Sequence, residues 1–228
     1  MLRAMKVIVF GATGMIGQGV LRECLLDPDV ERVLVIGRAP TGQKHDKLVE
    51  IVHADLFDLA SIEAELAGWD ACFFCLGISS AGMKEADYTR VTYDLTLAVA
   101  EVLARRNPAM SFVYVSGAGT DGSERGRSMW ARVKGKTENA LMRLPFKAAY
   151  MFRPGYIQPL RGIRSKTRWY QAVYDVIGPL YPLLRRVAPR YVTTTVNVGR
   201  AMIEVAAAGY PKNILTTDDI NRAAGGRG

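Results

Sequence analysis

Short apolar runs alternate with longer segments of helical spacing over the first 155 residues. The apolar runs are rich in β-branched and aromatic residues, which is typical of buried strands, and they span residues 6–10, 32–36, 49–54, 70–76, 111–116 and 147–153. The segments of helical spacing lie between them, at residues 15–26, 58–67, 85–106 and 128–143. Three prolines lie just beyond these helices, where proline cannot continue a helix: Pro28, Pro108 and Pro145.

This alternation predicts parallel strands joined by right-handed crossovers. We therefore expect an α/β fold with a doubly wound parallel sheet of the Rossmann type, covered by helices on both faces. A chain of 228 residues, 49% of them hydrophobic, has room for one large core, so a single domain over residues 1–228 is predicted.

The last segment, residues 156–228, departs from the alternation. It begins with an irregular basic and aromatic stretch, and continues with a helix near 196–208, a short strand near 213–216 and a possible helix from Asp218. We expect this segment to form a small lid on the substrate side of the ligand cleft.

Composition narrows the class of protein. Cys24, Cys72 and Cys75 are too few for a disulfide scaffold, and with His45 and His53 as the only histidines we expect no metal site. The N-terminal segment imitates a signal peptide, but glycines interrupt it and no cleavage pattern follows. No apolar run approaches the roughly 20 residues that a membrane-spanning helix needs. These observations predict a cytoplasmic protein without a transmembrane segment.

The formal net charge of +8 fits a polyanionic ligand, nucleic acid or an anionic membrane surface equally well. Much of the excess lies late in the chain, in "RGIRSKTR" (161–168) and "RRVAPR" (185–190). The mixture of aromatic, leucine and basic residues over 167–192 suits peripheral membrane contact, but three prolines break any long amphipathic helix there. A lid or a homodimer contact is the better interpretation, and without a nucleic-acid-binding motif we expect no nucleic-acid partner.

The first motif that carries chemistry is "VIVFGATGMIG", a strand that runs into three spaced glycines and then into a helix. In such a turn the first glycine permits the tight bend, the second lets backbone N–H groups approach a pyrophosphate, and the third lets the helix pack on the strand. The helix N-terminus then faces the phosphates. The phosphate-binding loop of NTPases needs a Gly-Lys-Ser/Thr ending that is absent here. A dinucleotide is therefore the predicted ligand, and its candidate contacts are Gly11, Thr13, Gly14, Met15, Ile16 and Gly17.

The end of the second strand distinguishes the two nicotinamide dinucleotides. An acidic side chain there hydrogen-bonds the ribose 2′-OH of NAD, and an arginine pairs with the 2′-phosphate of NADP. The stretch "VLVIGRAP" presents Gly37 and Arg38 with no acid, so NADP is favoured over NAD as the cofactor. Two alternatives stay open: Arg38 is a solvated loop residue, or it stacks on adenine without contacting a phosphate.

Several short motifs occur in an order typical of one group of proteins: "GATGMIG", "GR", "HADL", "CLG", "YVSGAG", "VKGKTE" and "FRPG". Over nearly its whole length the chain resembles the atypical short-chain dehydrogenases/reductases related to extended NAD(P)-dependent epimerase/dehydratases. It is most similar to their Tat-interacting-protein-like branch. The resemblance implies that Asp55 contacts adenine and that Leu76 and Gly77 lie beside the cofactor. Thr92 departs from the asparagine that extended members often carry.

The resemblance also implies a catalytic set. In the family a tyrosine four residues before a lysine exchanges the substrate proton, the lysine lowers the tyrosine's pKa and binds the nicotinamide ribose, and a serine after the fifth strand orients the carbonyl. Ser116 and Lys134 match this pattern, but Trp130 stands at the tyrosine position. An indole N–H donates a hydrogen bond but does not ionise in the accessible pH range, so Trp130 cannot act as the acid or base.

Three residues are candidates to replace the missing acid. Tyr156 follows "RPG" near the expected nicotinamide end of the cleft, and Tyr114 lies two residues before Ser116 on the same strand face. Lys134 is a candidate if burial lowers its pKa, although a cofactor phosphate nearby raises it. Each residue also has a plainer interpretation: the tyrosines as core or rim aromatics, Lys134 as a ribose-binding residue only, and Ser116 as a turn residue.

These residues leave two functions open. The first is an NADP(H)-dependent oxidoreductase or epimerase-like enzyme with altered proton chemistry, acting on a small carbonyl or hydroxyl substrate that the sequence does not identify. The second is a catalytically weak regulatory protein that binds NADP(H) and reports its state to a protein partner. Ser116 with Lys134 favours the first function, and Trp130 with the short lid favours the second.

Overall fold

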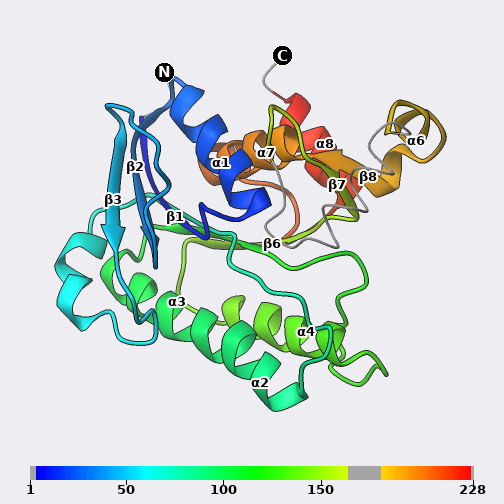
Figure 1. Cartoon of the computed structure of the whole chain (residues 1–228), viewed down its shortest axis with the longest axis horizontal. Coiled ribbons are helices and arrows are strands. Elements are labelled where there is room, and N and C mark those ends of the chain that lie inside the picture. The colour runs from blue at the N-terminus through cyan, green and yellow to red at the C-terminus, as the bar shows by residue number, and fades with distance from the viewer. Residues whose placement is uncertain (1–3, 164–180, 227–228) are drawn as a thin grey trace.

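The computed structural model describes residues 4–163 and 181–226 of the chain (Figure 1). Within these residues the central sheet has seven strands, all paired in parallel, in the order β3-β2-β1-β4-β5-β6-β9. The predicted doubly wound parallel sheet is therefore confirmed. Its strands are β1 (Met5–Phe10), β2 (Val30–Gly37), β3 (Leu48–Val52), β4 (Ala71–Phe74), β5 (Ser111–Val115), β6 (Ala148–Arg153) and β9 (Ile214–Thr216).

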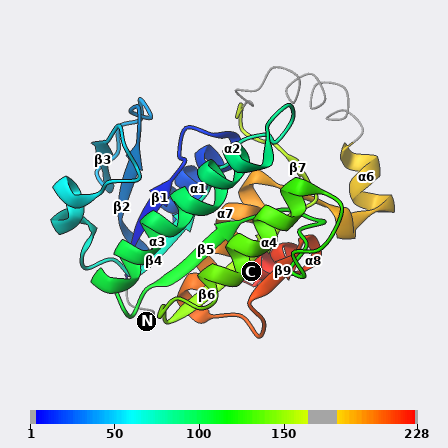
Figure 2. The ribbon, with the colours of Figure 1, turned by 90° about the horizontal axis from the view of Figure 1, so that it is seen from below.

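Helices cover both faces of the sheet, and Figure 2 looks onto the second of these faces. The first face is covered by α1 (Met15–Leu26), α7 (Thr195–Ala208) and α8 (Thr217–Gly225). The second face is covered by α2 (Glu85–Thr89), α3 (Leu95–Arg106) and α4 (Met129–Leu141).

Each face has its own apolar core, because successive strand side chains point in opposite directions. On β1, Val7 and Val9 pack against the α1 and α7 layer, while Ile8 and Phe10 pack against the α3 and α4 layer. All four side chains are fully buried. Burial on both sides explains why the strands read as continuous apolar runs.

The strand order reverses at β1, which pairs with β2 on one side and with β4 on the other. At the carboxyl end of β1, Phe10 is level with Ile36 and Phe74. The loops that leave these strands must therefore diverge to opposite faces of the sheet. Open α/β sheets bind their ligands in the crevice at such a reversal point.

Two of the expected helices form with altered geometry. The helix over 85–106 contains a π-helical turn, η2 (Arg90–Asp94), between α2 and α3. Thr92 is buried in this turn, and its carbonyl oxygen accepts a 2.5 Å hydrogen bond from the hydroxyl of Thr96. The helix expected at 58–67 is a 3₁₀ helix, η1 (Ala60–Leu66), and it buries only Leu66, too small an apolar face to anchor a longer α-helix.

The C-terminal segment divides into two parts. One part contains a separate pair of strands, β7 (Tyr156–Gln158) and β8 (Val192–Thr194), with α6 (Tyr181–Val187) and η4 (Pro189–Tyr191) before β8. The other part completes the main body, because β9 pairs with β6 and α7 packs on α1. Residues from α7 onward therefore belong to the sheet and its helical layer. The lid expected over 156–228 stays a prediction, as does the single domain.

Most of the basic aromatic segment at 161–192 lies outside the described residues, so the membrane, lid and dimer interpretations of it stay predictions. Among the helices that are described, none combines the length and apolarity needed to cross a bilayer.

The cysteines are placed as core residues. Cys72 is fully buried in the core beneath α3, and Cys75 packs against the core beneath α1, so the two thiols lie on opposite faces of the sheet. All three cysteines are free. Burial raises the pKa of the Cys75 thiol to about 12, so it stays protonated at neutral pH.

Candidate cofactor and substrate site

The turn after β1 has a backbone that its glycines alone permit. Gly11 has φ of 80°, and a Cβ on it would lie 2.7 Å from the backbone of Cys75. A Cβ on Gly17 would run into the backbone of Gly11, so glycine is required for α1 to approach β1 this closely. Gly14 caps α1, and its N–H donates to the carbonyl oxygen of Gly11 at 2.9 Å. The N-terminus of α1 therefore opens at the carboxyl edge of the sheet, an arrangement that suits a phosphate.

A cavity of about 370 Å³ lies beside this turn. It is formed by the glycine turn, the end of β2 and residues that follow β3 and β4. Four of the predicted cofactor contacts line it, namely Gly11, Thr13, Arg38 and Leu76. The other lining residues are Ala12, Val35, Ile36, Gly37, Ala39 and Leu56. In the described part of the chain Arg38 is thus the charged residue of this lining, and no carboxylate accompanies it.

The remaining predicted cofactor contacts do not line this cavity. Gly14, Met15, Ile16 and Gly17 form the start of α1, behind the glycine turn. Asp55 is exposed, and its Oδ1 accepts a 2.9 Å hydrogen bond from the N–H of Phe57, while the next residue, Leu56, lines the cavity. Gly77 is exposed beyond β4. The cofactor contacts assigned to these residues stay predictions.

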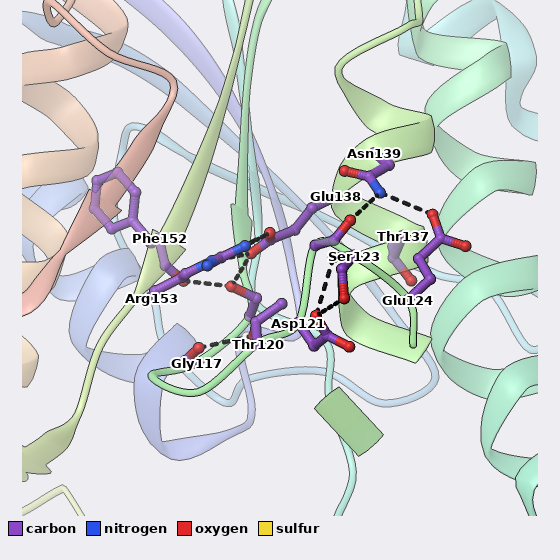
Figure 3. Close-up of polar contacts among 12 residues, drawn as sticks. Gly117, Thr120, Asp121, Ser123, Glu124, Thr137, Glu138, Asn139, Phe152 and Arg153 are labelled. Carbon is purple, nitrogen blue, oxygen red and sulfur yellow. Dashed lines mark hydrogen bonds and ion pairs between the residues drawn. The ribbon is translucent and has the colours of Figure 1, made fainter. Parts of the chain in front are cut away.

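Ser116 follows β5, and its hydroxyl is bound by groups on α4 and β6. Its Oγ lies 2.5 Å from Oε1 of Glu138 and 3.0 Å from the carbonyl oxygen of Phe152. Glu138 is fully buried and pairs with Arg153, whose Nη2 lies 2.5 Å from Oε2 and whose Nε lies 3.0 Å from Oε1 (Figure 3). A buried carboxylate needs such partners. The hydroxyl of Ser116 is therefore already part of an ion-pair network.

Lys134 lies on α4 beside the end of β5. Its Nζ donates to the carbonyl oxygen of Val115 at 3.2 Å and lies 5.3 Å from the centre of the Tyr114 ring. The side chain is half-buried. Burial lowers the pKa of Lys134 to about 8, although the negative charge of Glu138 opposes this change. Lys134 is a candidate acid on the condition that burial lowers its pKa, and the structure meets that condition.

Trp130 lies in the first turn of α4, and its six-membered ring packs on the loop after β5. A Cβ on Gly119 would lie 3.5 Å from that ring, so the indole sits close over the loop backbone. Asp121 fixes the loop by accepting a hydrogen bond from the hydroxyl of Ser123 at 2.6 Å (Figure 3). It accepts another from the N–H of Gly126 at 2.6 Å. These bonds, that of Ser123 first, lower the pKa of Asp121. Trp130 therefore packs against a hydrogen-bonded loop and brings no ionisable group.

The two tyrosine candidates lie in different parts of the molecule. Tyr114 is fully buried beneath α4, on the same face as Ser116, and burial raises the pKa of its phenol. Tyr156 lies on β7, and its hydroxyl donates to Oε1 of Gln158 at 2.8 Å. Burial raises the pKa of Tyr156 as well. The structure thus brings Ser116, Lys134 and Tyr114 together, and places Tyr156 on the separate two-stranded sheet.

The sequence assigns no role to Glu138 or Arg153, although both stand in motifs that carry the family resemblance. The sequence does hold one signal for them: each charged residue stands in a segment predicted to be a helix or strand of the core. Only the fold shows that the end of β6 meets α4, so that the two charges neutralise each other. The site therefore combines a glycine turn that suits a phosphate with a lysine whose pKa is lowered by burial.

A family model described as the NAD dependent epimerase/dehydratase family matches residues 7–135. The matched span contains the glycine turn, the cavity, Ser116 and Lys134. The chain belongs to the NAD-dependent epimerase/dehydratase family.

Curated relatives agree with the sequence resemblance. The chain is 30% identical to the mitochondrial protein fmp52 of Emericella nidulans over 175 residues, which cover 74% of this chain and 72% of the relative. It is 28% identical to protein HTATIP2 of Rattus norvegicus over 155 residues, which cover 67% of this chain and 62% of the relative. The resemblance to the Tat-interacting-protein-like branch of the short-chain dehydrogenases/reductases is thereby confirmed.

Solved structures of the same fold include enzymes from two bacteria. WbmF of Bordetella bronchiseptica, crystallised with NAD+, superposes with a TM-score of 0.67 at 16% identity over 97% of this chain and 77% of its own. The ADP-L-glycero-D-manno-heptose-6-epimerase of Helicobacter pylori superposes with a TM-score of 0.66 at 13% identity over 96% of this chain and 80% of its own. At these identities the likeness shows the fold alone.

The predicted cytoplasmic location is contradicted by the curated relatives. The relatives from Emericella nidulans, Scheffersomyces stipitis and Saccharomyces cerevisiae are all named mitochondrial proteins. The prediction depended on excluding a signal peptide and a membrane span, and neither exclusion bears on transport into an organelle.

Proposed function

We propose that this protein binds NADP(H) at the carboxyl edge of its sheet and catalyses hydride chemistry on a small carbonyl or hydroxyl substrate, with an altered proton step. The glycine turn supports pyrophosphate binding, because its glycines permit the tight bend after β1 and the close packing of α1, which open the N-terminus of α1 at the carboxyl edge of the sheet. WbmF, which shares the fold, was crystallised with NAD+, and this supports a nicotinamide dinucleotide as the ligand. When bound, such a cofactor supplies or accepts the hydride.

The observation that carries the proposal is the lining of the cavity beside the glycine turn. Arg38 stands at the end of β2, where the 2′-group of the adenosine ribose is recognised in this fold, and no carboxylate lines the cavity with it. The guanidinium of Arg38 is therefore placed to attract a 2′-phosphate, and no carboxylate of this lining repels it. This arrangement favours NADP(H) over NAD(H).

The test is a titration of the purified protein with NADPH and with NADH. We expect tighter binding of NADPH, and the variant Arg38→Ala should lose about 10- to 100-fold in NADPH affinity, the usual cost of a charge-assisted hydrogen bond. Affinity for NADH should stay nearly unchanged. The matched control is Arg32→Ala, because Arg32 is an exposed arginine on β2, the strand that precedes Arg38, and does not line this cavity. Equal affinity for both dinucleotides in wild-type protein would refute the NADP preference.

A second candidate function is a catalytically weak protein that senses NADP(H) and signals to a protein partner. It is favoured by one pair of observations: Trp130 cannot ionise, and the hydroxyl of Ser116 already bonds to Glu138. The two functions are distinguished by following NADPH oxidation with a panel of small carbonyl compounds in the same protein samples that bind NADPH. Binding without oxidation of NADPH by any compound would favour the sensor.

A further inference from the structure

Lys134 carries a positive charge that no carboxylate neutralises in an ion pair within the described residues. Its Nζ has one hydrogen bond, to the carbonyl oxygen of Val115, and otherwise lies over the ring of Tyr114. An aromatic face and one carbonyl stabilise an ammonium less than water or a carboxylate does. Val115 ends β5 at the edge of the sheet where ligands bind in this fold. Lys134 therefore holds its proton weakly, at the ligand-binding edge.

Glu138 lies one helical turn beyond Lys134 on α4, at the spacing where a glutamate commonly pairs with a lysine. Here both of its carboxylate oxygens bind Arg153 instead. Figure 3 shows the guanidinium of Arg153 reaching Glu138 from the end of β6. An arginine holds a carboxylate with two parallel bonds, which a lysine cannot do. Arg153 thus keeps the carboxylate of Glu138 from forming an ion pair with Lys134.

We propose that Lys134 donates the proton to the substrate oxygen in place of the missing tyrosine, and that Arg153 enables this by holding Glu138 in their ion pair. This inference rests on the proposed function and deepens it. In the reductive direction the carbonyl carbon receives a hydride with its electron pair from NADPH, and the carbonyl oxygen receives a proton from Nζ. The neutral amine then takes a proton from water. Lys134 is the catalytic residue of this step, and Glu138 and Arg153 are positioning residues.

The titratable groups near Lys134 are consistent with its role as the proton donor. Tyr114 cannot supply the proton, because burial raises the pKa of its phenol and its ring lies beneath Lys134. Burial is the largest influence on Lys134, and it brings the pKa to about 8, which suits an acid that works near neutral pH. The titratable group that acts on both Lys134 and Tyr114 is Glu138 on α4, which is paired with Arg153 on β6. Tyr88 on α2 acts on Tyr114 as well.

The direct test measures the pKa of Lys134 in the protein without cofactor. Lysines are labelled by reductive ¹³C-methylation, their NMR resonances are followed against pH, and the resonance of Lys134 is assigned by its loss in Lys134→Met. We expect it to titrate near 8, well below the ordinary 10.5 of lysine. Titration of this resonance near 10.5 would overturn the inference.

Two variants should differ in their effect on the pKa of Lys134 if the ion pair acts as proposed. In Arg153→Gln the carboxylate of Glu138 is released to Lys134, so the pKa of Lys134 should rise by about one unit or more. In Glu138→Gln the only opposing charge is removed, so the pKa should fall or stay low. The control is Arg132→Gln, which breaks the more exposed Arg132–Glu85 ion pair of the same helix and should leave the resonance unmoved. Unchanged titration in Arg153→Gln, with its folded spectrum preserved, contradicts the positioning role.

The kinetic test uses NADPH-dependent reduction of a carbonyl compound. The rate constant kcat should fall as pH rises through the pKa of Lys134, and this fall should move to higher pH in Arg153→Gln. Lys134→Arg keeps a positive charge but cannot release a proton, so kcat should drop about 100-fold or more while NADPH affinity changes little. Retained kcat in Lys134→Arg, or NADPH binding without any turnover, overturns the inference. Absence of NADPH binding refutes the proposed function instead, whatever the resonance of Lys134 shows.

Discussion

The two halves of the ligand site are built in different ways. At the turn after β1 the chain uses backbone alone, because Gly11 and Gly17 leave no space for a Cβ. At the end of β5 it uses side chains from three elements: Ser116 binds Glu138, which lies 22 positions away, and Glu138 binds Arg153, a further 15 positions away. The first half depends on local sterics, and the second on a long-range charge network.

This difference implies that cofactor binding and proton transfer are separable in this chain. The backbone turn accepts almost no substitution, so its geometry stays fixed while side chains around β5 vary. Trp130 illustrates the variation, since it packs on the loop where an ionisable tyrosine is expected and leaves the glycine turn untouched. Variants in each half should therefore affect different measurements.

The largest effect is expected from Gly17→Val. The added side chain meets the backbone of Gly11 and pushes α1 away from β1, so NADPH affinity should fall by roughly 1,000-fold, or about 4 kcal/mol. The protein should also lose about 1–3 kcal/mol of stability through overpacking. Fluorescence titration with NADPH and urea unfolding measure the two losses. The matched control is Gly225→Ala at the end of α8, where a Cβ meets nothing within 4 Å and binding should be unchanged. Retained NADPH affinity in Gly17→Val would contradict a backbone origin of binding.

The same contrast decides what is predictable from the sequence. The glycine turn and most strands follow from the local sequence, because short apolar runs rich in β-branched residues and the absence of a Cβ are visible in the letters. The pairing of Glu138 with Arg153 is not predictable, because no local pattern shows which buried carboxylate meets which arginine. The position of β9 is a similar case: three residues give a weak strand signal, and only pairing with β6 places them in the sheet.

A smaller effect is expected in the charge network. Glu138→Gln leaves Arg153 without its counter-charge while its side chain is only 21% exposed, and removing one partner of a buried ion pair costs about 3 kcal/mol. Urea unfolding should show this loss, whereas NADPH affinity should change less than threefold. Asp218→Asn is the control, because its ion pair with Arg222 is exposed and should be worth less than about 1 kcal/mol. Equal costs for the two variants would mean that the buried pair stabilises no more than a surface pair.

Trp130→Tyr tests how far the substrate half departs from the family. Placing an ionisable hydroxyl four positions before Lys134 should raise kcat, but by about 10-fold rather than the full 10²- to 10⁴-fold of general acid catalysis, because in the proposed mechanism Lys134 supplies the proton. Trp130→Phe introduces a ring of the size of tyrosine without the hydroxyl, so it should give no gain in kcat. Steady-state NADPH oxidation at fixed pH measures both. A gain above about 1,000-fold would indicate that the wild-type site has no working acid.

The smallest effect is a pH dependence of stability from Lys134. In the native protein its pKa lies at about 8, below the ordinary 10.5, so between these values the unfolded chain binds more protons than the native protein. Stability should therefore rise with pH through this window, and the penalty is fully present below pH 8. Because Lys134 is half-buried, solvent screening should limit the change to less than about 1 kcal/mol. Urea unfolding of wild type and Lys134→Met at several pH values between about 7.5 and 10 should show wild type gaining relative to the variant as pH rises. A constant difference would mean that Lys134 acts through packing alone, and the two halves of the site would then differ in geometry but not in electrostatics.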